Sequence, residues 1–261
     1  MMGLKNKAFL KEFLEEKYIL YSNPKFIVDD PVQIPHRYSK KEDIEIASLL
    51  AATLAWGNRK MIIFNLDRLL AKFGESPYEF VVNFKKKDAE RFEDFVHRTF
   101  NSNDCIQFIK VLNAIYKFKG GLEKVFSDGY SKTSSIESAI INYRLIFEKY
   151  CSIPHSLKHT PNVSKGSASK RINLFLRWMI RPTVEGVDFG LWNTIPTSSL
   201  MMPLDTHSGR VARSLGLVKR NQSDWKAVVE LTECLKEFDS NDPIKYDYAL
   251  FGLGIYEKFG L

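Results

Sequence analysis

The stretch KGSASKRINLFLRWMIR, residues 165–181, predicts an amphipathic helix that begins after a turn of small residues. Four apolar residues recur at the spacing of one helix face and are expected to enter a core: Ile172, Phe175, Leu176 and Met179. The opposite face, which we expect solvent to reach, carries Lys170, Leu174, Arg177 and Arg181. Gly166 precedes the helix in a hairpin that exposes backbone N–H groups, and such donors suit a phosphate.

Helical patterns recur along most of the chain, and the sequence lacks alternating strand patterns of useful length. The predicted helices cover residues 12–20, 40–56, 61–73, 92–100, 105–118, 135–150, 169–180, 205–215, 225–238 and 243–253. We therefore predict an all-α fold in which one domain, residues 1–261, consists of two helical lobes with a groove between them.

The composition excludes several classes of protein. Hydrophobic residues make up 44% of the chain and charged residues 26%, as in globular proteins that bury a core. Cys105, Cys151 and Cys234 are far apart and form no CxxC pair, so we expect no zinc or other metal site, no iron–sulfur cluster and no cofactor. The longest apolar run, residues 46–56, is too short to span a bilayer, so we expect a cytoplasmic protein without a membrane partner.

Positive charge is concentrated in one part of the sequence. The net charge is +7, and residues 160–220 hold nine basic residues against three acidic ones. The basic residues are Lys165, Lys170, Arg171, Arg177, Arg181, Arg210, Arg213, Lys219 and Arg220. A cationic zone attracts a phosphate backbone through counterion release, although a solvated basic face without a ligand explains the charge equally well.

A second motif, MPLDTHSGRVARSLGL, occupies residues 202–217. Asp205 is placed to cap a helix by accepting hydrogen bonds from the N–H groups of His207 or Ser208. An aspartate before a helix more often serves only as a cap. A single histidine, likewise, more often has only a structural role. The second motif is stronger evidence of a function when it is considered together with the first.

The two motifs together resemble the signature of the helix-hairpin-helix base-excision DNA glycosylases. In that superfamily a glycine hairpin precedes a lysine that opens a helix, and Gly166 and Lys170 match these positions. A Pro-hydrophobic-Asp-x-His run follows downstream, and Pro203, Asp205 and His207 match it. The motif regions are residues 152–181 and 202–217. Residues 43–60, DIEIASLLAATLAWGNRK, resemble the early helix that ends in a polar turn at the lesion site.

The resemblance implies an all-α fold with a helix-hairpin-helix motif bordering a DNA-binding cleft. Lys170 would be the amine nucleophile, and Asp205 the carboxylate that stabilises positive charge on the sugar. The implied DNA contacts are Lys165, Gly166, Ser167, Arg171, Arg177, His207 and Arg210. The implied pocket for the extruded base contains Trp56, Asn58, Arg59 and Trp192. The expected partner is damaged double-stranded DNA, bound by a monomer that associates with the nucleoid.

Two departures from the family pattern matter. The usual hairpin is Gly-x-Gly, and Ala168 replaces its second glycine, which requires a backbone without positive φ at that residue. Lys170 and Asp205 are 35 positions apart, a long gap that resembles the archaeal 8-oxoguanine glycosylases. This similarity implies removal of 8-oxoguanine, followed by strand cleavage through a Schiff base.

Two other functions remain open from the sequence. A non-catalytic helix-hairpin-helix DNA-binding protein would keep the hairpin, His207 and the arginines but would not need Lys170 or Asp205. A helical scaffold for protein partners would show no salt-dependent affinity for DNA.

Overall fold

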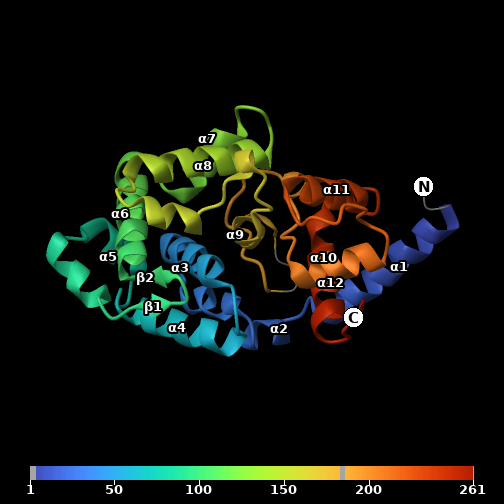
Figure 1. Ribbon diagram of the computed structural model, residues 1–261, viewed down its shortest axis with the longest axis horizontal. Coiled ribbons are helices and arrows are strands. Elements are labelled where there is room, and N and C mark those ends of the chain that lie inside the picture. The colour runs from blue at the N-terminus through green and yellow to red at the C-terminus, as the bar shows by residue number, and fades with distance from the viewer. Residues whose placement is uncertain (1–3, 183–185, 261) are drawn as a thin grey trace. The chain divides into compact units, whose positions relative to one another are not determined.

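The computed structural model describes residues 4–182 and 186–260, and nearly all of its regular secondary structure is helical (Figure 1). This architecture confirms the predicted all-α class. The chain divides into two compact units, one of residues 1–26 together with 165–261 and the other of residues 27–164. No helix among the described residues has the length and apolar character needed to cross a membrane.

The first unit gathers the two ends of the chain around α9. Its helices are α1 (Leu4–Tyr21), α9 (Lys170–Ile180), α10 (Thr206–Ser214), α11 (Trp225–Lys236) and α12 (Tyr246–Ile255), with 3-10 helices η6 (Thr197–Ser199) and η7 (Pro243–Lys245). α12 packs against both α1 and α10. Ring contacts support this packing, such as Tyr18 on Tyr248, whose centroids are 6.3 Å apart.

The second unit is a helical bundle with one small hairpin. Its helices are α3 (Lys41–Leu54), α4 (Arg59–Ala71), α5 (Pro77–Asn83), α6 (Ser102–Phe118), α7 (Leu122–Tyr130) and α8 (Ile136–Tyr150). Its 3-10 helices are η1 (Pro31–Gln33), η2 (Pro35–Arg37), η3 (Lys86–Phe92) and η4 (Pro154–His159). α7 and α8 pack side by side (Figure 1), and the rings of Phe126 and Tyr143 stack between them. α2 (Lys25–Val28) and η5 (Val163–Lys165) lie where the chain passes from one unit to the other.

The predicted helix over residues 92–100 is wrong. η3 ends at Phe92, and two short antiparallel strands follow, β1 (Val96–His97) and β2 (Phe100–Asn101). His97 pairs with Phe100, so the connecting loop has two residues, and the first of them, Arg98, has φ 56. Loops of this length need positive φ, which ends any helix. Phe92, Phe95 and Phe100 are buried, but they reach the core from a 3-10 helix, a turn and a strand and not from one face of an α-helix.

The core face predicted for residues 169–180 is confirmed. Ile172, Phe175, Leu176 and Met179 are all buried in α9. The helix begins at Lys170, as the lysine-first pattern requires, and Ser169 is its N-cap. Arg177 and Arg181, on the opposite face of the predicted helix, are also buried, and this changes the interpretation of these two cations.

Candidate active site

The hairpin before α9 is held against the start of α11. Ser167 forms an isolated antiparallel bridge with Asp224, and the N–H of Trp225 donates to the carbonyl of Gly166 at 3.0 Å. Gly166 has φ +84, and a Cβ built there would meet no described atom within 4 Å. The backbone turn, and not crowding, therefore favours glycine at this position.

The left-handed residue at the start of α9 is Ser169, with φ 54, and not Ala168. The Ser169 hydroxyl donates to the carbonyl of Ser167 at 3.1 Å, which ties the two sides of the turn together. Ala168 does not have positive φ, so the condition set by the missing second glycine is met.

Asp205 is the N-cap of α10. Its Oδ1 accepts the backbone N–H of Ser208 at 2.7 Å and the Ser208 hydroxyl at 3.0 Å. The Asp205 N–H in turn donates to that hydroxyl oxygen at 2.9 Å, which completes a reciprocal capping box. The predicted capping role and the predicted Ser208 partner are confirmed.

Lys170 and Asp205 form an ion pair in which Nζ lies 3.2 Å from Oδ2. The side chain of Lys170 is 33% exposed and that of Asp205 is 12% exposed, so solvent reaches the amine more than the carboxylate. Burial by itself raises a carboxyl pKa, but the Lys170 ammonium and the hydrogen bonds from Ser208 outweigh it. The pKa of Asp205 is therefore below its usual value, and the carboxylate is ionised at neutral pH.

A second carboxylate, Asp247 in the first turn of α12, belongs to the same electrostatic environment. It is buried and pairs with Nη1 of Arg177. Burial raises the pKa of Asp247 to about 6, Arg177 opposes this increase, and the negative charge of Asp205 adds to it. We did not predict Asp247 from the sequence, where the available signal was a charged residue inside the apolar run YDYALFGLG.

Arg177 and Arg181 are each only 3% exposed, which corrects the expectation that solvent reaches them. Arg177 donates from Nε to Asp188 at 3.1 Å. Arg181 joins Asp188 at 3.0 Å and Asp242 at 2.8 Å. Buried guanidinium groups require carboxylate partners, and here Asp188 comes from the loop that follows α9 and Asp242 from the segment before α12. The predicted DNA contact of Arg177 is therefore wrong, because the side chain is enclosed by its own unit.

Trp192 is only 1% exposed, which corrects its assignment to the base pocket. Its ring meets the ring of Phe175 edge-on at a centroid distance of 5.4 Å, and its backbone N–H donates to the carbonyl of Met179 at 2.9 Å. The residue is part of the core around α9 and is closed to a base.

The other predicted pocket residues, Trp56, Asn58 and Arg59, lie in the unit of residues 27–164. Asn58 caps α4, because its side chain accepts the N–H of Met61 at 3.3 Å. The indole of Trp56 is half-buried beneath the guanidinium of Arg98, whose Cζ lies 4.6 Å from the ring centroid. The role of these three residues in a base pocket stays a prediction.

The remaining predicted DNA contacts differ in their exposure to solvent. Lys165 is exposed, whereas Arg171 is half-buried and burial lowers its pKa. Arg210 donates to the carbonyls of Gly254 at 3.1 Å and Phe259 at 3.3 Å, so its guanidinium joins α10 to the end of the chain.

His207 is half-buried on α10, and its Nδ1 has no hydrogen-bond partner among the residues that the structure describes. A Cβ built on Gly254 would lie 3.1 Å from Cβ of His207, so α10 and α12 approach closely at this point. The absence of a side chain at residue 254 leaves room for the histidine.

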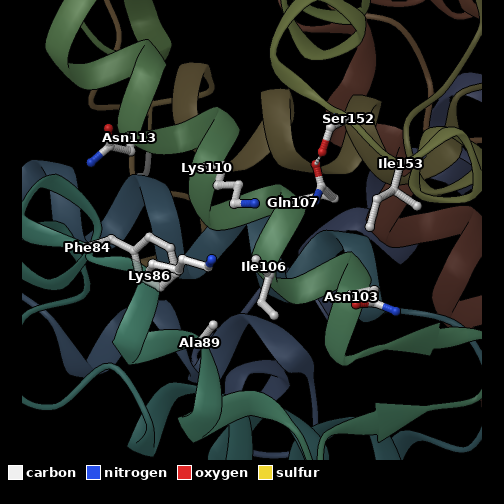
Figure 2. Close-up of a pocket in the computed structure, with 10 residues that line it drawn as sticks. All are labelled: Phe84, Lys86, Ala89, Asn103, Ile106, Gln107, Lys110, Asn113, Ser152 and Ile153. Carbon is white, nitrogen blue, oxygen red and sulfur yellow. Dashed lines mark hydrogen bonds between the residues drawn. The ribbon is translucent and has the colours of Figure 1, made fainter.

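A cavity of about 600 Å³ lies within the second unit, and none of the predicted site residues lines it. Figure 2 shows Phe84, Ile106 and Ile153 lining it, together with two amines from Lys86 and Lys110. Close to it in the chain, Asp104, His155 and His159 form the group of described residues that could hold a metal ion.

Residues 30–256 match a protein family described as "Protein of unknown function (DUF2400)". Neither the curated proteins nor the solved structures give a match. Since the family match extends over most of the chain, the protein belongs to the family described as protein of unknown function (DUF2400).

Proposed function

We propose that the protein is a DNA repair glycosylase that removes an oxidised base, with 8-oxoguanine as the expected lesion, and then cleaves the strand through a Schiff base. The observation that carries the proposal is the pair formed by Lys170 and Asp205, whose Nζ and Oδ2 atoms are 3.2 Å apart. An amine and an ionised carboxylate at the starts of two helices are the two groups that this chemistry requires.

Asp205 would stabilise the transition state of base loss. Breaking the N-glycosidic bond builds positive charge on the deoxyribose, and a fixed negative charge nearby lowers the energy of that state. The capping box with Ser208 holds the carboxylate in one orientation before the reaction begins. Its lowered pKa keeps it charged at neutral pH.

Lys170 would supply the nucleophile. After its ammonium loses a proton, the Nζ lone pair forms a bond to C1′, and the base leaves with the electrons of the glycosidic bond and takes up a proton. Opening of the sugar then breaks the C1′–O4′ bond, protonates O4′ and leaves a C1′=N Schiff base. Loss of a C2′ proton from this intermediate expels the 3′ phosphate and cleaves the strand.

The hairpin before α9 would bind the DNA backbone beside Lys170. Gly166 and Lys165 are exposed directly before α9, whose N-terminus favours an anion. Enzymes that act on C1′ extrude the nucleotide from the duplex, so a phosphate contact beside the amine would hold the strand during extrusion. Of the nine basic residues at positions 160–220, Arg177 and Arg181 are buried, so at most seven are available to contact DNA.

Borohydride trapping tests the proposal. The full-length protein is incubated with duplexes that each carry one lesion, with 8-oxoguanine, an abasic site and undamaged DNA among them, and sodium borohydride is then added. We expect a covalent protein–DNA adduct with the 8-oxoguanine and abasic duplexes only, because borohydride reduces a Schiff base to a stable amine.

Two variants make the test specific. Lys170→Ala should abolish the adduct, while Lys219→Ala, which removes an exposed lysine outside the site, should leave it unchanged. Salt-dependent duplex binding without any adduct would instead identify a non-catalytic DNA-binding protein. Absence of both binding and adduct would point to a scaffold for protein partners.

A further inference from the structure

A cluster of two histidines and one aspartate lies in the second unit, separate from the Lys170–Asp205 pair. Asp104, in the first turn of α6, is fully buried. Nδ1 of His155 lies 3.0 Å from Asp104 Oδ1, and Nε2 of His159 lies 3.2 Å from Asp104 Oδ2. One potential ligand atom from each residue falls within 4.8 Å of the other two. Both histidines come from η4, so a short segment and a helix start build the whole cluster.

The carboxylate of Asp104 is fixed by groups other than the histidines. The Ser156 hydroxyl donates to Oδ1 at 2.6 Å, and the backbone N–H of Asn101 donates to Oδ2 at 2.9 Å. Each oxygen therefore has one lone pair held by the protein and one directed at an imidazole nitrogen. Such outer hydrogen bonds are what orient metal ligands in proteins.

The charge balance of the cluster favours a cation. Asp104 is fully buried, and its two carboxylate oxygens accept hydrogen bonds from the Ser156 hydroxyl and the Asn101 N–H. The groups that contact the carboxylate are a hydroxyl, a backbone N–H and two imidazoles, which carry no formal charge when the imidazoles are neutral. A buried anion with neutral partners is stabilised by a cation placed among them.

We propose that Asp104, His155 and His159 bind a divalent first-row transition metal ion, with Zn²⁺ as the best fit. Zinc bonds of about 2.0–2.1 Å to nitrogen and oxygen place ligand atoms roughly 3.3 Å apart in a tetrahedral site. His155 Nδ1 lies 3.0 Å from Oδ1 and His159 Nε2 lies 3.2 Å from Oδ2, so each nitrogen is close to that separation from one oxygen of the Asp104 carboxylate. Three protein ligands leave the fourth position for water.

Access to the site comes from His155, whose side chain is 46% exposed, whereas that of His159 is only 2% exposed. The edge of the Phe100 ring packs on His159 at a centroid distance of 4.9 Å and holds that imidazole in place. A metal would therefore enter past the exposed His155 and meet Asp104 and His159 already in position. Asn103 and Ile153, close to the cluster in the chain, line the cavity in Figure 2.

His155 must change tautomer when the metal binds. Its Nε2 contacts the ammonium of Lys158, which can only donate, so Nδ1 carries the ring proton in the metal-free protein. Coordination through Nδ1 moves that proton to Nε2, and the exposed side chain of Lys158 then swings into solvent.

Metal titration of the full-length protein tests the proposal. After treatment with a chelator and its removal by dialysis, the protein is titrated with Co²⁺, which reports tetrahedral coordination by its visible d–d absorption, and with Zn²⁺ by calorimetry. We expect one equivalent of either ion to bind, Zn²⁺ to displace Co²⁺, and Zn²⁺ to raise the melting temperature by linkage.

His155→Ala removes the exposed ligand with little risk to folding and should weaken binding at least tenfold. His159→Ala should abolish the Co²⁺ band. His36→Ala, which changes a histidine of the same unit outside the cluster, should bind like the wild type. The proposal is overturned if the wild type gives no stoichiometric band, or if the band persists unchanged in both cluster variants, because the ion is then bound elsewhere on the surface.

Discussion

Nζ of Lys170 and Oδ2 of Asp205 lie 3.2 Å apart, although the two residues are 35 positions apart in the sequence. Lys170 is the first residue of α9, and Asp205 is the N-cap of α10. The starts of two helices therefore converge at one point, where both helix dipoles favour negative charge. This environment suits an ionised aspartate and a DNA phosphate.

Asp205→Asn separates the charge of this residue from its capping role. Asparagine caps a helix as well as aspartate does, so we expect the melting temperature to change little. Loss of the negative charge should slow base removal about 100-fold or more, as with other fixed electrostatic groups. Single-turnover excision from an 8-oxoguanine duplex measures the rate. An unchanged rate would show that the carboxylate serves the fold alone.

Asp247 makes stability depend on pH with a defined sign. Folding raises its pKa from the usual 3.8 to about 6, so the folded state binds the proton more tightly. Stability from this group is therefore fully present below pH 4 and is lost as pH rises from about 4 to 6, by about 3 kcal/mol in total. Urea unfolding of the wild type and Asp247→Asn should show this loss in the difference between their pH profiles. Parallel profiles would contradict the prediction.

Replacing Arg177 by alanine should lower stability, whereas replacing Lys165 by alanine should weaken DNA binding. Arg177→Ala leaves Asp188 and Asp247 without one of their buried partners and should destabilise the protein by about 3–5 kcal/mol. Lys165→Ala removes an exposed cation at the hairpin and should change stability by at most about 1 kcal/mol, because interactions of exposed charges contribute little. It should reduce the slope of log affinity for duplex DNA against log salt by about one. Denaturant unfolding and salt-dependent binding provide the two readouts, and an exchange of these effects would refute the burial argument.

Gly252→Ala tests the packing of α1 on α12. A Cβ at residue 252 would lie 2.1 Å from Cδ2 of Tyr21, so the ring or the helix must move. We expect destabilisation of about 1–3 kcal/mol from this overpacking. Replacing Tyr21 by alanine as well should recover part of the loss, because the obstacle is then removed. Thermal unfolding of the single and double variants measures this, and additive losses would argue against the contact.

The sequence predicts the fold class and the start of α9 well, because both depend on local pattern. Apolar spacing identifies the core face of α9, and the residue types at 166, 170 and 205 mark two helix starts. These features are encoded within a few neighbouring residues, so no knowledge of distant contacts is needed.

Other features depend on partners far away in the sequence. Arg177 has the spacing of a surface residue, and its burial depends in part on Asp247, which lies 70 positions further along the chain. The hairpin at residues 96–101 escapes prediction because Arg98 adopts a positive φ that is uncommon outside glycine. The histidines at 155 and 159 carry a recognisable spacing, but the aspartate that joins them lies on another helix.

Mass spectrometry of the trapped adduct tests the central claim most directly. After borohydride reduction with an abasic or 8-oxoguanine duplex, the protein is digested with protease and nuclease, and the peptide carrying the reduced sugar is sequenced. We predict that the modification lies on the side chain of Lys170 and on no other amine. A sugar attached to a different lysine or to the N-terminus would contradict the assignment of the nucleophile.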